Sequence, residues 1–183
     1  MEIINGERLV LGTCYYPEHW DESLWRDDLR RMLENGIEVI RIAEFAWSKI
    51  ERYEGVFNYD FFDRFLDLAE EMGMKVIFCT PTATPPAWLT EKYPEVLNAN
   101  MDGVLYRHGA RRHYNYNSPK YQELTRIIVE KSASHYAKHP AIIGWQIDNE
   151  LNCEKDVFYS ESDTIAFRKF LEKKYETIDA LNA

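Results

Sequence analysis

Asn149 and Glu150 follow closely after an apolar run that extends from Ala141 to Ile147. Such a run is typical of a buried strand, and the chain must leave the core where it ends, so Glu150 is directed to the rim of the fold. Glycoside hydrolysis needs a carboxylic acid that protonates the departing oxygen and a second carboxylate on the other side of the anomeric carbon. Glu150 is a candidate for that acid, and the Asn149 amide is a candidate for holding the 2-hydroxyl group of the sugar.

Carboxylates, arginines and aromatic rings also gather after three earlier apolar runs. They are Tyr15, Tyr16, Glu18, His19 and Trp20 after the first run, Glu44, Phe45 and Trp47 after the second, and Trp88, Arg107, His108, Arg111, Arg112, His113, Tyr114 and Tyr116 after the third. Planar polar groups can read hydroxyl groups, and aromatic faces stack on the C–H faces of sugar rings. If the runs end at one rim, these residues suit a polyhydroxylated ligand.

The aromatic rings and histidines also have a purely structural interpretation. A single aromatic ring near a strand end more often fills the core than it binds a sugar. His19, His108 and His113 are better explained as structural histidines, because no HExxH or similar spacing supports a metal site.

Two interpretations stay open for the charged residues. Glu44 fits best as the buried partner of Arg41 or of an arginine in the third loop. Arg111 and Arg112 could form an exposed pair, but their place in a long loop beside aromatic residues makes a ligand contact equally plausible.

Four predicted strands and four predicted helices position these residues. The strands cover about Leu9 to Tyr15, Ile37 to Ala43, Lys75 to Thr80 and Ala141 to Ile147. The helix signals are Asp21 as N-cap with a stop at Asn35-Gly36, Asp60 as N-cap with a stop at Gly73, Ser118-Pro119 as a third start, and Asp163 to Tyr175 as the fourth helix. Capping residues and glycine stops mark helix ends, whereas continuous apolar runs mark strands covered on both faces.

The order of these elements predicts an α/β fold. Strands alternate with helices along the chain, which implies a parallel sheet with right-handed crossovers. The segment from Pro81 to Asn117 is a long excursion at the carboxyl end of the third strand, where α/β proteins keep their active sites. No linker divides the chain, so residues 1–183 are predicted to form part of one domain, with no separate second domain.

The composition disfavours several classes of protein. The chain has 183 residues with 31 acidic and 22 basic side chains, a net charge of −9. This excess disfavours nucleic acid as a partner. Three scattered cysteines suit the reducing cytoplasm. The sequence shows neither a signal peptide nor a run of about 18 apolar residues, so we expect neither export nor a membrane span.

Five segments, in this order, together resemble the N-terminal half of a glycoside hydrolase family 42 β-galactosidase. They are residues 15–20 (YYPEHW), 41–48 (RIAEFAWS), 82–89 (TATPPAWL), 111–114 (RRHY) and 146–150 (QIDNE). The resemblance extends from about Leu9 to the last residues of the chain.

The resemblance implies a (β/α)8 TIM barrel, of which this chain holds about the first four βα units. It also implies hydrolysis of terminal β-galactosides with retention of configuration. Glu150 matches the family's acid/base, and Asn149 matches the neighbouring residue that contacts the sugar. Arg111 matches the arginine of the third loop that reaches the galactose.

The resemblance also bears on metals. Some members of the family hold a structural zinc ion through a cysteine in the third loop and a cysteine cluster after the acid/base. Here Asn115 stands at the first of these positions, and no cysteine lies between Asp156 and Thr164. We therefore expect no zinc and no other cofactor, and Cys153 is expected to be a packed thiol.

The family's nucleophile is a glutamate at the end of the seventh strand, whereas this sequence contains four strands. The other rim carboxylates, Glu18, Glu44 and Asp148, do not match the nucleophile motif. The chain alone is therefore expected to be inactive, with the C-terminal barrel half or a second copy of itself as its partner.

Two alternatives to hydrolysis stay open. The chain could be a non-catalytic module that binds galactosides or takes part in assembly, or it could serve an unrelated reaction on the same fold. Within sugars, the sequence does not separate β-galactosides from α-L-arabinosides.

Overall fold

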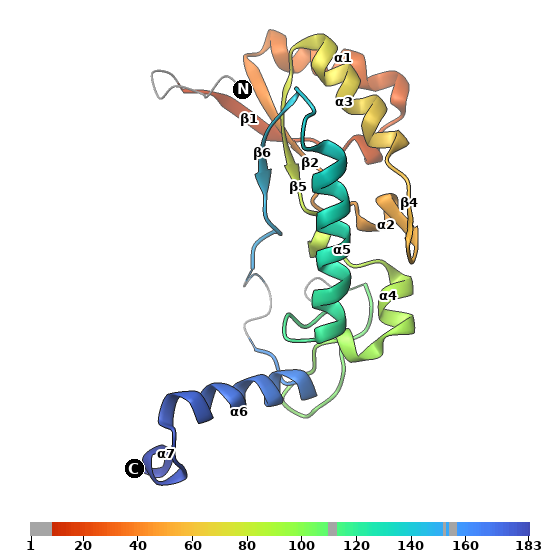
Figure 1. Cartoon of the computed structure of the whole chain (residues 1–183). Coiled ribbons are helices and arrows are strands. Elements are labelled where there is room, and N and C mark those ends of the chain that lie inside the picture. The colour runs from red at the N-terminus through yellow and green to blue at the C-terminus, as the bar shows by residue number, and fades with distance from the viewer. Residues whose placement is uncertain (1–8, 110–112, 152, 154–156) are drawn as a thin grey trace. The chain divides into compact units, whose positions relative to one another are not determined.

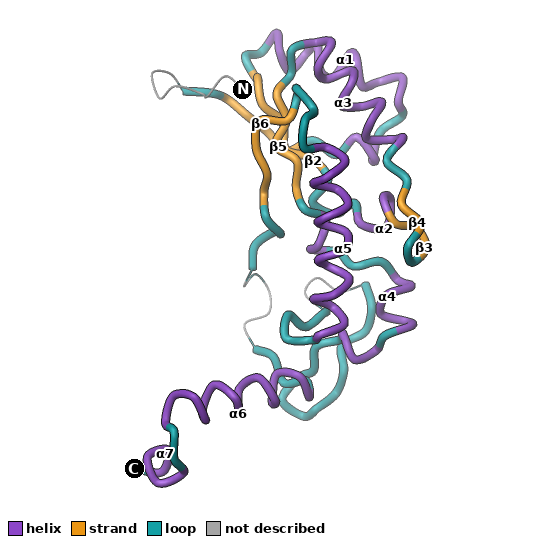
Figure 2. The backbone as a smooth tube through the Cα atoms, in the orientation of Figure 1, coloured by secondary structure: helices purple, strands orange, loops and turns teal. Residues whose placement is uncertain are grey.

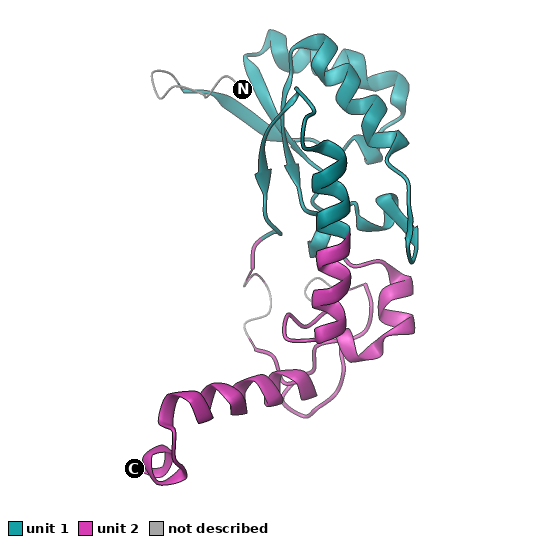
Figure 3. Cartoon of the chain, viewed as in Figure 1, with its two compact units in different colours: residues 1–84, 128–149 teal, residues 85–127, 150–183 magenta. Residues whose placement is uncertain are grey.

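A computed structural model of the chain describes residues 9–109, 113–151, 153 and 157–183. These residues divide into two compact units (Figure 3). Unit 1 comprises residues 1–84 and 128–149, and unit 2 comprises residues 85–127 and 150–183. Each unit is described by itself.

Unit 1 is built on a parallel sheet of four strands in the order β1, β2, β5, β6 (Figures 1 and 2). These strands are Leu11–Cys14, Ile37–Ile42, Lys75–Cys79 and Ile142–Gln146. In register, Thr13 pairs with Ile40, Ile40 with Val76, and Phe78 with Trp145. The predicted alternation of strands and helices and the parallel pairing are confirmed.

Helices α1 (Glu22–Glu34), α3 (Asp60–Met72) and α5 (Pro119–Tyr136) follow three of these strands. Asp21 caps α1 as predicted, since its side chain accepts a hydrogen bond from the Ser23 N–H. Gly73 ends α3 with φ of 78°, a left-handed conformation that disfavours other residues. The predicted capping role of Asp60 is wrong. Tyr59 is the N-cap, and the Asn58 side chain accepts from the Asp60 N–H instead.

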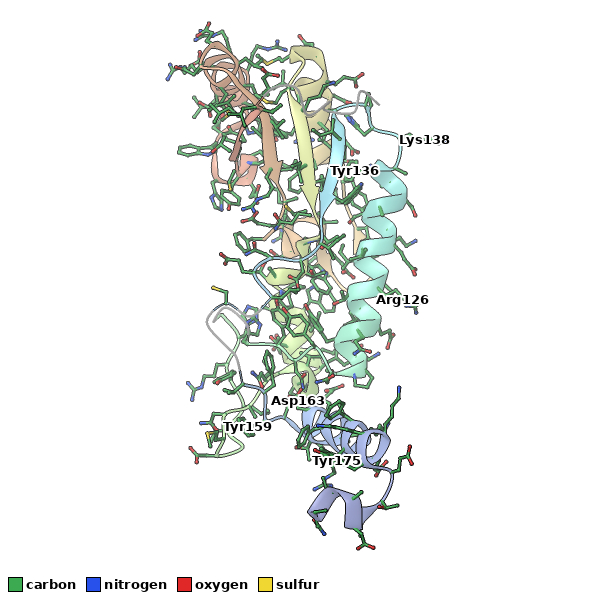
Figure 4. All side chains as sticks on the ribbon, turned by 90° about the vertical axis from the view of Figure 1, so that its left-hand side faces the viewer. Arg126, Tyr136, Lys138, Tyr159, Asp163 and Tyr175 are labelled. Carbon is green, nitrogen blue, oxygen red and sulfur yellow. The ribbon has the colours of Figure 1, made fainter. Side chains whose placement is uncertain are left out.

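An aromatic core lies between the sheet and the helices of unit 1. The Trp25 and Phe65 rings meet edge to face with centroids 5.1 Å apart, and the Phe62 and Phe78 rings lie 5.7 Å apart. Tyr136, at the end of α5, packs on Phe78 with centroids 4.8 Å apart (Figure 4). These contacts pack α3 and the end of α5 against β5, and they pack α1 against α3.

A short hairpin that the sequence analysis did not predict follows helix α2 (Trp47–Ile50). It consists of β3 (Glu51–Tyr53) and β4 (Val56–Phe57). The buried Glu51 carboxylate accepts hydrogen bonds from Trp47 Nε1 at 2.7 Å and from the Gly55 N–H at 2.8 Å. Burial nevertheless dominates and raises the Glu51 pKa.

The two outer strands of the sheet expose apolar side chains. All four residues of β1 are exposed, with Leu11 at 56%, and Ile147 just after β6 is 74% exposed. Each of these strands pairs with one neighbour among the residues that the structure describes. Strands of an all-parallel sheet are ordinarily buried on both faces, so these edges lack the cover that such strands receive in a closed fold.

Unit 2 contains the long third excursion from residue 85 onward and the C-terminal helices. Its elements include α4 (Ala87–Lys92), the 3-10 turn Pro94–Val96, α6 (Glu161–Tyr175) and α7 (Ile178–Asn182). The fourth helix begins at Glu161, two residues before the predicted start. Ser160 is its N-cap in a reciprocal capping box with Asp163, so Asp163 is the third helical residue (Figure 4). No described helix combines the length and apolar character needed to cross a bilayer.

Candidate active site

The carboxyl ends of the four parallel strands bring polar side chains together in unit 1. Cys14 ends β1, Arg41 lies near the end of β2, Cys79 ends β5 and Gln146 ends β6. Parallel strands necessarily present their carboxyl ends at one edge of the sheet. The predicted common rim is therefore confirmed for the ends of these four strands.

An ion pair between a half-buried arginine and a buried carboxylate lies at this rim. Arg41 Nη2 lies 2.8 Å from Glu44 Oε2, and the Glu44 side chain is only 3% exposed. The Tyr16 hydroxyl donates to Glu44 Oε1 at 2.6 Å. Burial and this carboxylate raise the pKa of Tyr16, which keeps the phenol protonated and therefore a donor. Of the two partners considered for Glu44, the structure confirms Arg41.

Gln146 connects this ion pair to the turn that carries the catalytic candidates. Its Oε1 accepts from Arg41 Nη1 at 2.7 Å. Its Nε2 donates to the Asp148 carbonyl at 2.8 Å and to Asn149 Oδ1 at 3.3 Å. The Asp148 N–H donates in turn to Thr80 Oγ1, at the end of β5, at 2.7 Å.

The turn after β6 is strained. Asp148 and Glu150 have φ values of 54° and 40°, in the left-handed region that residues other than glycine rarely occupy. Such a conformation persists only where surrounding contacts hold it, and it is common at functional sites. The hydrogen bonds from Gln146 and to Thr80 are contacts of this kind.

The predicted site residues have different places in the structure. Asn149 is the last residue of unit 1 and is 7% exposed, with its N–H donating to Asp148 Oδ1 at 2.7 Å. Glu150 is exposed and begins the next segment of unit 2, where its carbonyl accepts from the Cys153 N–H at 2.9 Å. Arg111 lies outside the described residues.

A second polar cluster lies within unit 2, around Asn115. The Asn115 amide donates to the Ser160 and Ser162 hydroxyls, the second at 2.7 Å. Asn117 Nδ2 donates to Asp163 Oδ1 at 2.7 Å. The Asn115 amide, at the position compared with a zinc-binding cysteine, thus donates to two hydroxyl groups, and amides and hydroxyls are poor ligands for zinc.

Several aromatic candidates are structural. Trp47 is fully buried and donates to Glu51, and Tyr15 donates to Asp28 at 2.8 Å. Tyr16 stacks on His19 and on Phe45, with ring centroids 5.2 and 5.9 Å apart. These stacked rings remain candidates for a sugar platform.

His108 has the structural role expected of it, because its Nδ1 lies 3.0 Å from Thr90 Oγ1.

Cys79 should be unreactive although it lies at the rim. It is fully buried, and burial together with the nearby Glu44 charge raises the pKa of its thiol to about 12. Thiolate is the reactive form, and a pKa three units above the ordinary value leaves about a thousandfold less of it.

In a C153S background, a maleimide at pH 7.5 is expected to label the exposed Cys14 while leaving Cys79 unmodified until the chain is unfolded. Equal labelling of the two thiols in the native chain contradicts this burial.

Sequence reasoning missed the residues that hold the turn. Neither Gln146 nor Thr80 was assigned a role from the sequence. Their only signal is that they are polar residues at the ends of apolar strands. Gln146 follows four strand residues that have neither a charged nor an amide side chain. An amide in such an apolar setting needs hydrogen-bond partners, and this need could have marked Gln146 out.

Four parallel βα units with polar side chains collected at the carboxyl ends of the strands define the chain as a partial (β/α)8 barrel of the glycosidase type. The glycoside hydrolase family 42 model, described as beta-galactosidase, matches residues 14–183. The chain belongs to this family.

Relatives of known identity agree with the family assignment. Beta-galactosidase Bga of Halorubrum lacusprofundi is 42% identical over 94% of this chain and 25% of its own length. A beta-galactosidase of Thermus thermophilus is 44% identical over 94% of this chain and 27% of its own length. The crystal structure of beta-galactosidase from Marinomonas ef1 superposes with a TM-score of 0.91 at 43% identity, covering 95% of this chain and 27% of that one. The chain thus spans about a quarter of the length of the curated relatives it matches.

Proposed function

We propose that this chain supplies the acid/base half of a retaining β-galactosidase barrel. The observation that carries the proposal is the Asn149-Glu150 pair at the carboxyl end of the fourth parallel strand, in a turn held by side chains from β5 and β6. Family membership and the names of the relatives support the substrate class.

In the proposed mechanism, Glu150 protonates the glycosidic oxygen as the bond to the leaving group breaks. A glutamate from the seventh strand, in a segment outside this chain, attacks the anomeric carbon and forms a galactosyl-enzyme. Glu150 then takes a proton from water as that intermediate is hydrolysed. Asn149 and Arg111 bind the sugar, and no cofactor takes part.

The proposal includes the organisation of the protein. Residues 1–183 form the first four βα units of one barrel domain, and the second half of the barrel covers the exposed strands β1 and β6. We place the protein in the cytoplasm, which its three scattered cysteines support.

A complementation assay tests this function. The chain alone is expected to release little nitrophenol from a nitrophenyl β-galactoside. Addition of a separately produced segment with the four remaining βα units should restore turnover, and Glu150→Gln should abolish the restored activity. Turnover by the chain alone that survives Glu150→Gln, or a reconstituted barrel that is inactive, contradicts the proposal.

The exposed apolar edges favour a second candidate, an assembly module that pairs with a copy of itself. Leu11 and Ile147 are 56% and 74% exposed, and exposed parallel edges invite pairing. Size-exclusion chromatography with mass measurement separates the candidates. A stable dimer that does not bind the second barrel half supports the module.

A further inference from the structure

The orientation of the Gln146 amide is determined by its neighbours. A guanidinium group only donates hydrogen bonds, so the atom 2.7 Å from Arg41 Nη1 must be the amide oxygen. A main-chain carbonyl only accepts, so the atom 2.8 Å from the Asp148 oxygen must be the amide nitrogen. Both neighbours require the same orientation, which removes the usual ambiguity of an amide side chain.

The orientation of the Gln146 amide determines the direction in which the Asn149 amide oxygen points. Gln146 Nε2 is a donor 3.3 Å from the Asn149 side chain, so Asn149 turns its oxygen toward Gln146. The nitrogen of Asn149 then lies on the opposite side of the same planar group. Asn149 is 7% exposed and its main chain is held by Asp148, so the side chain cannot easily turn over.

We infer that Gln146 is a positioning residue, which fixes the polarity of the Asn149 amide so that Asn149 donates a hydrogen bond to the 2-hydroxyl oxygen of the sugar. The inference rests on the proposed function, because it assigns a role for the same reaction. Gln146 does not touch the sugar and acts through Asn149. Hydrogen bonds to the 2-hydroxyl strengthen in the transition state of glycoside hydrolysis, so the loss of Gln146 should lower kcat more than it raises KM.

A pair of substrates tests this role in the complete barrel. The pair is a nitrophenyl β-galactoside and its 2-deoxy analogue, which differ only in the group that Asn149 binds. Gln146→Met is expected to lower kcat/KM for the galactoside about 100-fold, the scale of a misplaced contact. The same variant should change kcat/KM for the 2-deoxy analogue only a few-fold.

A double-variant cycle identifies the route of the effect. Asn149→Ala should erase the preference for the 2-hydroxyl substrate in the same way. If Gln146 acts through Asn149, adding Gln146→Met to Asn149→Ala should cost little more than Asn149→Ala alone.

Two further variants control for folding. Gln146→Glu keeps an acceptor for Arg41 but has no donor for Asn149 or for the Asp148 carbonyl, so it should lose the 2-hydroxyl preference, and its melting temperature shows whether it is folded at the assay temperature. It replaces Gln146→Met if that variant does not fold. Gln122→Met is the matched control, because Gln122 Nε2 donates to a main-chain carbonyl, that of Tyr116, at 2.8 Å. This control should keep wild-type kinetics.

Two results overturn the inference. Either the Gln146 variants lose activity equally on both substrates, or they keep the wild-type preference for the 2-hydroxyl. Failure of the proposed function is recognised separately, because Glu150→Gln would then leave turnover of the galactoside intact. An inactive Glu150→Gln with an unaffected Gln146→Met overturns only the role of Gln146.

Discussion

Glu150→Gln in the complete barrel should lower kcat/KM for an alkyl β-galactoside by about a thousandfold, the range of general acid catalysis. An alkoxide departs only when the glycosidic oxygen is protonated, and glutamine cannot supply that proton. A dinitrophenolate departs without help, so the same variant should form the galactosyl-enzyme from dinitrophenyl β-galactoside nearly as fast as the wild type. Steady-state kinetics on the two substrates measure this difference.

The second half of the reaction gives an independent measurement. Without Glu150, water is not deprotonated as it attacks, so the galactosyl-enzyme should accumulate. Azide attacks without a base and should therefore accelerate turnover of the dinitrophenyl substrate, with β-galactosyl azide as the product identified by mass spectrometry. Retention of the β configuration in that product reports the double displacement.

The matched control for this prediction is Glu71→Gln, on the surface of α3. Glu71 is exposed and pairs with Arg26, away from the strand ends, and its replacement should leave both substrates unaffected. Equal losses on the alkyl and dinitrophenyl substrates for Glu150→Gln mean that Glu150 is not the acid. If azide does not accelerate turnover of the dinitrophenyl substrate, Glu150 is not the general base.

The sequence predicted the four strands and their parallel order because apolar runs and glycine stops are local signals. Gly36 and Gly73 have φ values of 79° and 78° where the helices were expected to end. Tyr121, Leu124 and Ile128 are buried in α5 at a spacing that places them on one face of the helix, which is again a local pattern. Local signals of this kind do not depend on which distant segment completes the fold.

The missed elements depend on contacts that spacing does not reveal. The β3–β4 hairpin is too short to carry a periodic pattern, and the buried Glu51 that links Trp47 to Gly55 reads in the sequence as one charged residue in a loop. Asp60 looked like a cap because aspartate often is one, but it is the first residue of α3, and its own N–H donates to the Asn58 side chain.

The candidate site was predictable only in part, because only some of its residues have local signals. Asn149 and Glu150 were found because they follow an apolar run, and Arg41 was one of the two partners considered for Glu44. Gln146 contacts Arg41 from 105 positions away along the chain. A contact at that separation needs the strand order β2, β5, β6, which a composition or a motif does not contain.

Arg41→Met should destabilise the chain by about 3 kcal/mol, the lower end of the cost of leaving a buried charge without its partner, because Arg41 itself is only half-buried. Glu44 is 3% exposed, and Arg41 is 2.8 Å from it. Methionine fills much of the space of the arginine stem but supplies no charge. The Glu44 carboxylate would stay buried with two neutral donors, the Tyr16 hydroxyl at 2.6 Å and the Cys79 thiol at 3.9 Å. Gln146 would also lose the donor that orients its amide. Urea unfolding followed by circular dichroism measures the free energy of unfolding.

The double variant Arg41→Met with Glu44→Gln distinguishes a stranded charge from lost packing. It removes both charges, and the glutamine oxygen still accepts from Tyr16, so the double variant should be more stable than Arg41→Met alone. Arg26→Met is the matched surface control. Arg26 makes a two-pronged pair with Glu71, but both side chains are exposed, so this variant should unfold at nearly the wild-type urea concentration. If the double variant is no more stable than Arg41→Met, the loss arises from the packing of the arginine stem, and the ion pair does not hold the rim together.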